Sequence, residues 1–191
     1  MKGLVPLAVG LGIAGGSAVH ASAASASAVA AVRAAVARDM TIAVAPWIPC
    51  AHGRATPLTL QTVRAQQRLV DAMIDQTYAP NEPTHAGIRT RLRALIAAYG
   101  PGGAATRAGE TLCDVGGGID QVQARAITLT QNRAQMTVQA HEWNETVGYH
   151  NHRAFHFKPQ AIIMQTDDAV LLHGHWLISR RGPVTFMTGA P

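Results

Sequence analysis

The sequence predicts an α+β domain in which helices come first and antiparallel strands follow. Over the first half of the chain, apolar residues recur every three to four positions, which is typical of amphipathic helices. From about residue 121 onward they alternate with polar residues, which is typical of strands with one buried face. The chain has 191 residues, of which 48% are hydrophobic and 14% charged. This composition excludes a disordered chain, and residues 24–191 are expected to form one domain.

The segment 1–23 has the layout of a secretory signal peptide. Lys2 precedes an uncharged stretch, and small residues then provide cleavage positions after Ala21 or Ala23. A retained membrane anchor is the alternative, because no Asp, Glu, Lys or Arg lies between Lys2 and Arg33. We favour cleavage, since the second half of the segment is mostly Ala, Ser and Gly and only weakly apolar. The expected location is therefore secreted or in the cell envelope, with membrane contact only if the segment is retained.

Export determines how the two cysteines are interpreted. In an oxidising compartment, Cys50 and Cys113 are expected to form a disulfide. Closing a loop of this length should stabilise the fold by about 4 kcal/mol in the chain-entropy model. The alternative is one reactive thiol with a histidine base, but no residue next to either cysteine favours it.

Three helices are predicted, and proline or glycine ends each of them. They cover about residues 24–44, 56–79 and 84–99. Two prolines in the segment Ala45–Cys50 end the first helix. Thr56 caps the second with Pro57 in its first turn, and Thr84 caps the third. A glycine-rich loop is then expected over residues 100–120.

An antiparallel sheet is predicted from about residue 121 to residue 187. The alternation of apolar residues changes phase after Ala126 and again after Ala140. A change of phase within a strand is typical of a β-bulge, so two of them in neighbouring strands predict a bent sheet. The expected hairpin tips are Gln131-Asn132 and Asp167-Asp168.

Histidines are concentrated late in the chain, with six of the nine between residues 141 and 175. Among them are two H-x-H pairs, His150 with His152 and His173 with His175. On a strand, residues i and i+2 point to the same side, so each pair could offer two imidazoles to zinc or copper. Unliganded histidines on a half-exposed sheet are the alternative. We expect no cofactor, with a zinc or copper site at these pairs as the competing hypothesis.

The order of elements, together with a late Trp176-Leu177-Ile178-Ser179 strand, resembles the NTF2-like (SnoaL-like) cone fold. More narrowly, Thr137-Val138-Gln139-Ala140-His141-Glu142-Trp143, followed by Tyr149 and His156, is similar to the N-terminal domain of exported actinobacterial proteins that carry a cell-wall amidase domain. The resemblance covers about residues 105–185. It implies a curved sheet whose concave side, lined by helices, leaves a pocket, and it implies an extracytoplasmic setting.

The resemblance implies two classes of function. Enzymes of this superfamily place Asp, His or Tyr in the pocket for acid–base chemistry, and other members are non-catalytic binding or assembly modules. The candidate catalytic residues are His141, Glu142, Tyr149 and His156. We expect a secreted or envelope-associated module that binds a small ligand or a protein partner without catalysis. The alternatives are an isomerase-, dehydratase- or cyclase-type enzyme on a small apolar substrate and an extracytoplasmic metal-binding protein.

Charge and fold also predict the partners. The formal net charge is +5, from 16 basic and 11 acidic residues. The basic residues are scattered and form no run, so a nucleic-acid partner is not expected. Two copies are expected to pair through the open face of the sheet, as relatives of this fold do. Wall hydrolysis is not expected, because neither cysteine lies in a catalytic context.

Overall fold

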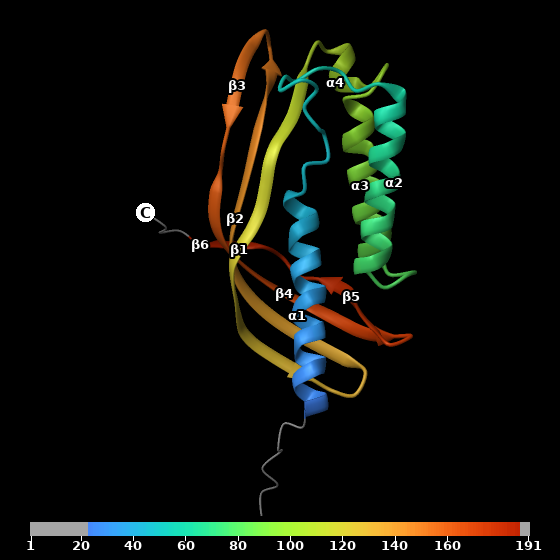
Figure 1. Cartoon of the computed structure of the whole chain (residues 1–191), viewed down its shortest axis with the longest axis vertical. Helices are drawn as coiled ribbons and strands as arrows, with labels where there is room; N and C mark the ends of the chain where they lie inside the picture. The colour runs from blue at the N-terminus through green and yellow to red at the C-terminus, as the bar shows by residue number, and fades with distance from the viewer. Residues whose placement is uncertain (1–22, 188–191) are drawn as a thin grey trace, which may run out of the picture.

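The computed structural model describes residues 23–187 and confirms the predicted α+β fold class (Figure 1). Four helices pack on a strongly curled antiparallel sheet. The predicted signal peptide lies, apart from Ala23, outside the described residues. Within the described part of the chain, no helix combines the length and the apolar character needed to cross a membrane.

Three of the helices match the predicted ones, with differences at their N-termini. The helices are α1 (Ala23–Val44), α2 (Leu60–Thr77), α3 (Pro83–Ala98) and the single turn α4 (Ala104–Arg107). The N-cap of α2 is Thr59 rather than Thr56, and its side chain accepts a hydrogen bond from the N–H of Thr62. The N-cap of α3 is Glu82, so Thr84 lies inside the first turn. Proline suits the first position of α3 because it has no N–H to leave unsatisfied.

The sheet has six strands, and every strand pair in it is antiparallel. The strands are β1 (Thr111–Leu129), β2 (Arg133–His150), β3 (Arg153–Phe157), β4 (Gln160–Leu172), β5 (His175–Arg181) and β6 (Thr185–Met187). The main order is β1-β2-β4-β5, with β3 paired to β2 and β6 paired to β4. The long strand β2 therefore holds β1 along one side and β4 and β3 in turn along the other.

The core lies between the helices and one face of this sheet. Helix α1 contacts β1, β2, β4 and β5, while α2 and α3 pack against each other as a hairpin (Figure 1). Fully buried apolar residues come from all of these elements, among them Val36, Met40, Ile74, Ile96, Met136, Val138, Ile163 and Ile178. On β2 and β4 these residues alternate with half-buried or exposed ones, as expected for a sheet covered on one face.

The glycine-rich loop predicted over residues 100–120 is wrong, because β1 begins at Thr111. The glycines are needed inside the strand for close approach. A Cβ on Gly117 would lie 2.1 Å from the carbonyl oxygen of Val44, and a Cβ on Gly118 would lie 2.9 Å from Nε1 of Trp143. Glycine at these positions lets the end of α1 and the indole ring lie directly against the strand.

The predicted bend of the sheet is partly confirmed. The β1–β2 pairing has three register shifts, the last between Ala124 and Ala126, and each inserts an extra residue on the β1 side. At Ala140 the predicted place of an irregularity is right but the strand is wrong. A β1–β2 register shift lies opposite Ala140, between Asp120 and Gln123, but its extra residue belongs to β1, and β2 pairs with β4 in continuous register. The apolar alternation of β2 stops there for another reason: residues 141–147 are all half-buried, which leaves no sharply buried face.

One predicted hairpin tip is confirmed and the other is wrong. Gln131-Asn132 lies in the turn between β1 and β2, whereas Asp167-Asp168 lies within β4 and pairs with β5. The sequence segments predicted to flank that tip form a single strand. Two other hairpins turn at Asn151-His152 (φ 49° and 62°) and His173-Gly174 (φ 49° and 82°). Positive φ at both central residues is the geometry of the tight turn that matches strand twist.

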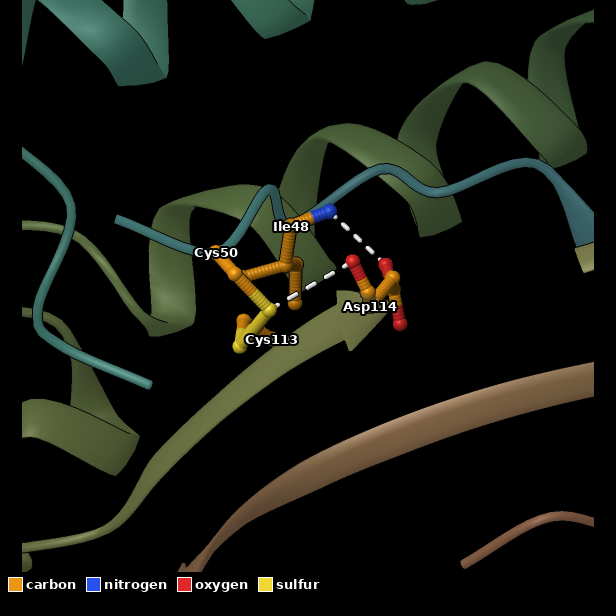
Figure 2. The surroundings of a disulfide bond; sticks show 4 residues. All are labelled: Ile48, Cys50, Cys113 and Asp114. Carbon is orange, nitrogen blue, oxygen red and sulfur yellow. Dashed lines mark hydrogen bonds between the residues drawn. A yellow bond between two sulfur atoms is a disulfide. The ribbon is translucent and has the colours of Figure 1, made fainter. Parts of the chain in front are cut away.

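The predicted disulfide between Cys50 and Cys113 is confirmed (Figure 2). It joins the segment after α1 to β1, with the two Cα atoms 4.9 Å apart. Next to it, the N–H of Ile48 donates to Oδ2 of Asp114 at 2.8 Å, and the N–H of Asp114 donates to the carbonyl oxygen of Ile48 at 2.6 Å. Burial raises the pKa of Asp114, and the backbone N–H groups of Ile48 and Trp47 oppose the shift. Since both cysteines are bonded, the reactive-thiol alternative is wrong.

Candidate functional site

A group of polar side chains is buried between α1 and the sheet. It consists of Asp39 from α1, Tyr78 directly after α2, Gln165 and Asp167 from β4, and Arg181 from β5. The first four expose 1% or less of their surface. Buried carboxyl groups are stable only where partners replace the lost water, so we examine this group first and name it the Asp39–Asp167 cluster.

Hydrogen bonds link every member of the cluster. The hydroxyl of Tyr78 donates to Oδ1 of Asp39. Nε2 of Gln165 donates to Oδ2 of Asp39 at 2.5 Å and to Oδ1 of Asp167 at 2.7 Å. Nε of Arg181 lies 3.3 Å from Oδ2 of Asp39, which gives that carboxylate a buried cationic partner. The N–H of Gly182 adds a second donor to Oδ1 of Asp167 at 3.3 Å.

The surroundings of Asp167 favour its protonated form. Burial, followed by the nearby charge of Asp39, raises the pKa of Asp167 to about 8. Asp167 therefore keeps its proton at neutral pH. Burial and the same neighbour raise the pKa of Tyr78 far above its ordinary range, so this phenol stays protonated and remains a donor.

The interior of the curled sheet is thus filled by side chains that bind one another. Substrate cannot reach Asp39 or Asp167 without movement of the groups that cover them, because each exposes 1% or less of its surface. Within the described residues, Oδ2 of Asp167 is a buried polar atom that lacks a hydrogen-bond partner. In this arrangement the cluster ties α1, the end of α2 and the sheet together.

The sequence analysis did not identify this cluster, although a signal was present. Asp39 follows Val32 by seven residues and Val36 by three, so it lies on the apolar face of the first helix. Asp167 continues the buried alternation of Ile163 and Gln165 on its strand. A carboxylate inside an apolar stripe indicates either a buried network or a functional group, and the pattern alone does not supply its partners.

A hollow of about 660 Å³ lies next to the cluster, between α1, the end of α2, the start of α3 and the β4–β5 hairpin. Its lining consists of Arg38, Asp75, Gln76, Tyr78, Pro80, His85, Leu172, His173, His175 and Leu177. Tyr78 belongs both to this wall and to the Asp39–Asp167 cluster, so the two features share one residue. We name this hollow the helix–hairpin pocket.

The structure changes the basis of the metal hypothesis. His152 and His173 occupy hairpin turns with positive φ, so neither pair lies along a strand, and the assumed i, i+2 strand geometry is wrong. The two turns lie towards opposite ends of the molecule (Figure 1). His150 Nδ1 is 2.7 Å from Oε1 of Glu110, while His173 and His175 line the helix–hairpin pocket. Across residues 23–187 no group of three or more His, Cys, Asp or Glu side chains is placed to hold a metal ion.

The four residues considered for acid–base chemistry lie in different surroundings. His141 and His156 each contact a carboxylate, in the pairs His141 Nδ1–Asp120 Oδ1 (2.7 Å) and His156 Nε2–Glu145 Oε1 (2.8 Å). Tyr149 is 53% exposed. Burial raises the pKa of Glu142, and the charge of Arg181 opposes the shift. No hydrogen bond or ion pair of the described chain joins any two of the four candidates.

Comparisons with known proteins give the chain no family. No family model matches the sequence, and no curated protein matches it at a significant level. A solved structure that is similar is the crystal structure of the intermembrane space region of the chloroplast protein ARC6. The TM-score is 0.41 and the identity 10%, over 61% of this chain and 78% of that chain. Similarity at this level supports no argument about function, so the α+β fold is established here and the NTF2-like relationship stays a prediction.

Proposed function

We propose that this protein is an extracytoplasmic, NTF2-like binding module that holds a small ligand in the helix–hairpin pocket and has no catalytic activity. The observation that carries this proposal is the pocket itself, which adjoins a filled and buried interior. The Cys50–Cys113 disulfide supports the oxidising setting, because such bonds persist outside the cytosol. The signal-peptide layout of the first 23 residues supports the same setting.

The state of the interior favours binding over catalysis. Acid–base catalysis requires ionisable groups that touch the substrate. In the Asp39–Asp167 cluster, both carboxyl groups accept hydrogen bonds from Gln165 and are buried away from solvent. This cluster therefore supports the fold beneath the pocket, and the pocket wall supplies the groups that meet a ligand.

The pocket has the general properties of a small-molecule site. Its volume of about 660 Å³ lies within the usual range of roughly 300–1,000 Å³. Its wall combines the apolar side chains of Pro80, Leu172 and Leu177 with six polar ones, those of Arg38, Asp75, Gln76, His85, His173 and His175. Apolar walls supply affinity, and a few convergent polar groups orient the ligand.

A second candidate is an acid–base enzyme, favoured by one observation. Asp167 has a pKa raised to about 8, and carboxyl groups with such shifts are frequent in active sites. In this case the covering groups would have to move, among them Tyr78, which lines the pocket and is hydrogen-bonded to Asp39. A ligand-bound crystal structure with ligand atoms in contact with Asp167 would favour the enzyme over the binding module.

An NMR titration tests the proposed binding function. Octanol serves as a neutral apolar probe, added at millimolar concentration to ¹⁵N-labelled protein. We expect the largest shifts in the backbone amides of Tyr78, Leu172 and Leu177, and we expect Leu172→Trp to abolish them by filling the pocket. Leu95→Trp, at a 39% exposed leucine outside the pocket, is the matched control and should leave the shifts unchanged. Pocket amides that stay unchanged with octanol and with anionic octyl compounds alike would refute the proposed function.

A further inference from the structure

We propose that the ligand of the helix–hairpin pocket is an amphipathic anion, with a carboxylate or phosphate head group and an apolar body. This inference rests on the proposed binding function and adds the chemical class of the ligand. Three features of the pocket lead to it: a guanidinium that forms no ion pair within residues 23–187, an acid that already contacts basic side chains, and an apolar wall beside them.

Arg38 supplies the cationic side of the pocket. It projects from α1, and its Nη2 donates to the carbonyl oxygen of Trp176 at 3.2 Å, which fixes the guanidinium against β5. Its Nε is buried and has no hydrogen-bond partner among the described residues. Arg38 also takes part in none of the ion pairs formed within residues 23–187. A half-buried guanidinium with an unused donor is suited to a planar or tetrahedral oxyanion.

The acid in the lining already has two basic neighbours. Oδ1 of Asp75 accepts from Nη2 of Arg89 and lies 2.9 Å from Nε2 of His85. Arg89 is also paired with Asp71 and lies outside the pocket lining. Of the two charged lining residues, Arg38 and Asp75, Arg38 is therefore the one that forms no ion pair within residues 23–187.

The hairpin side adds further donors and the apolar surface. His173 and His175 line the pocket from the β4–β5 turn, and neither forms an ion pair within the described residues. Imidazole nitrogens can donate to an oxyanion. Leu172 and Leu177 come from the same hairpin and line the hollow together with Pro80, which provides a surface for an alkyl or ring system. An ion alone would leave this apolar surface unused.

The experiment is an NMR titration of the whole protein with four probes: octanoate, octyl phosphate, octanol and inorganic phosphate. We expect octanoate and octyl phosphate to bind at least about tenfold more tightly than octanol. Inorganic phosphate, which lacks the apolar body, should bind at least about tenfold more weakly than octyl phosphate. Tighter binding of octanoate would identify a carboxylate head group, and tighter binding of octyl phosphate a phosphate head group.

Two variants locate the head group. Arg38→Gln should weaken octanoate binding roughly tenfold and change octanol binding by less than about twofold. Arg125→Gln is the matched control, because Arg125 also donates to an uncharged oxygen, the side-chain Oε1 of Gln139, but lies outside the pocket. If Arg38→Gln does not fold, His173→Asn replaces it, since asparagine accepts the left-handed backbone of this turn. It too should weaken octanoate binding selectively.

The outcomes separate the two proposals. Equal affinity for octanoate and octanol, or an unchanged octanoate affinity in the folded Arg38→Gln variant, would overturn the anion inference and leave the binding function in place. Absence of pocket shifts with all of the probes would overturn the binding function itself.

Discussion

Asp39 and Asp167 lie close together in the folded protein, although they are far apart in the sequence. The described residues bury little other charge. The protein tolerates them because Tyr78, Gln165 and Arg181 supply donors from three different elements. Buried polar networks of this kind stabilise a fold only when nearly all of their hydrogen bonds are made. The retained proton on Asp167 meets part of this requirement, because two adjacent carboxylates could not both remain ionised in the interior.

The proton on Asp167 leads to a prediction about stability and pH. The folded protein keeps this proton up to about pH 8, whereas an unfolded aspartate loses it near pH 4. The stabilising contribution of the proton is thus complete below about pH 4 and is lost as the pH rises towards 8. Asp167→Asn cannot ionise, so its free energy of unfolding should fall less than that of the wild type between pH 4 and pH 8.

Urea unfolding of both proteins at several values between pH 4 and pH 8 measures this difference. Glu82→Gln, at the start of α3, is the control for loss of an acid outside the cluster, and its curve should run parallel to that of the wild type. Parallel curves for Asp167→Asn and the wild type would contradict the assigned protonation.

At the scale of elements, α1 can lie close to β1 because the strand has a glycine where the end of the helix meets it. β1 is an edge strand of the main sheet with three register shifts, and such irregularities protect an edge from pairing with other chains. Gly117 lies where the C-terminal end of α1 meets this strand, and Gly118 lies under the indole of Trp143. The glycines that predicted a loop thus permit a strand to lie close to a helix end.

Substitution of two glycines should have opposite effects. Gly117→Ala places a Cβ 2.1 Å from the backbone oxygen of Val44, so the end of α1 must move. We expect a loss of about 2 kcal/mol or more in the free energy of unfolding. A Cβ at Gly87, inside α3, meets nothing within 4 Å, so Gly87→Ala should raise stability by about 0.5–1 kcal/mol. Denaturant unfolding tests both, and equal effects at the two sites would disprove the packing argument.

At the scale of the whole molecule, the helical half and the sheet half are joined at separate points. The Asp39–Asp167 cluster joins them in the C-terminal part of α1, and the N–H of Ala79 donates to the carbonyl oxygen of Ile178 at 2.8 Å. The Cys50–Cys113 bond joins the segment after α1 to β1 across a sequence separation of 63 residues. Both α2 and α3 lie inside the loop that this bond closes.

Removal of the disulfide should therefore destabilise the entire domain. In the chain-entropy model a loop of this length is worth about 4 kcal/mol, because the bond restricts the unfolded chain. We expect the free energy of unfolding of the Cys50→Ser, Cys113→Ser double variant, measured in urea, to be lower than that of the wild type by about this amount. The wild type with its disulfide reduced should show the same loss. Equal stability of the oxidised and reduced proteins would contradict a structural role for the bond.

The sequence by itself determined the fold class, the three main helices, the disulfide partners and the turn at Gln131-Asn132. These features depend on local periodicity, on turn chemistry and on the presence of two cysteines, all of which can be read without knowledge of contacts. Only the tertiary structure decided that Gly116–Gly118 form a strand, that the H-x-H histidines lie at turns, and that Asp39 and Asp167 share one buried network. Each of these depends on residues distant in sequence, such as Val44 and Trp143 at the glycines, and on strand pairing that places Asp167 against Arg181. Local patterns set the period of each element, whereas the neighbours of a side chain are set by packing.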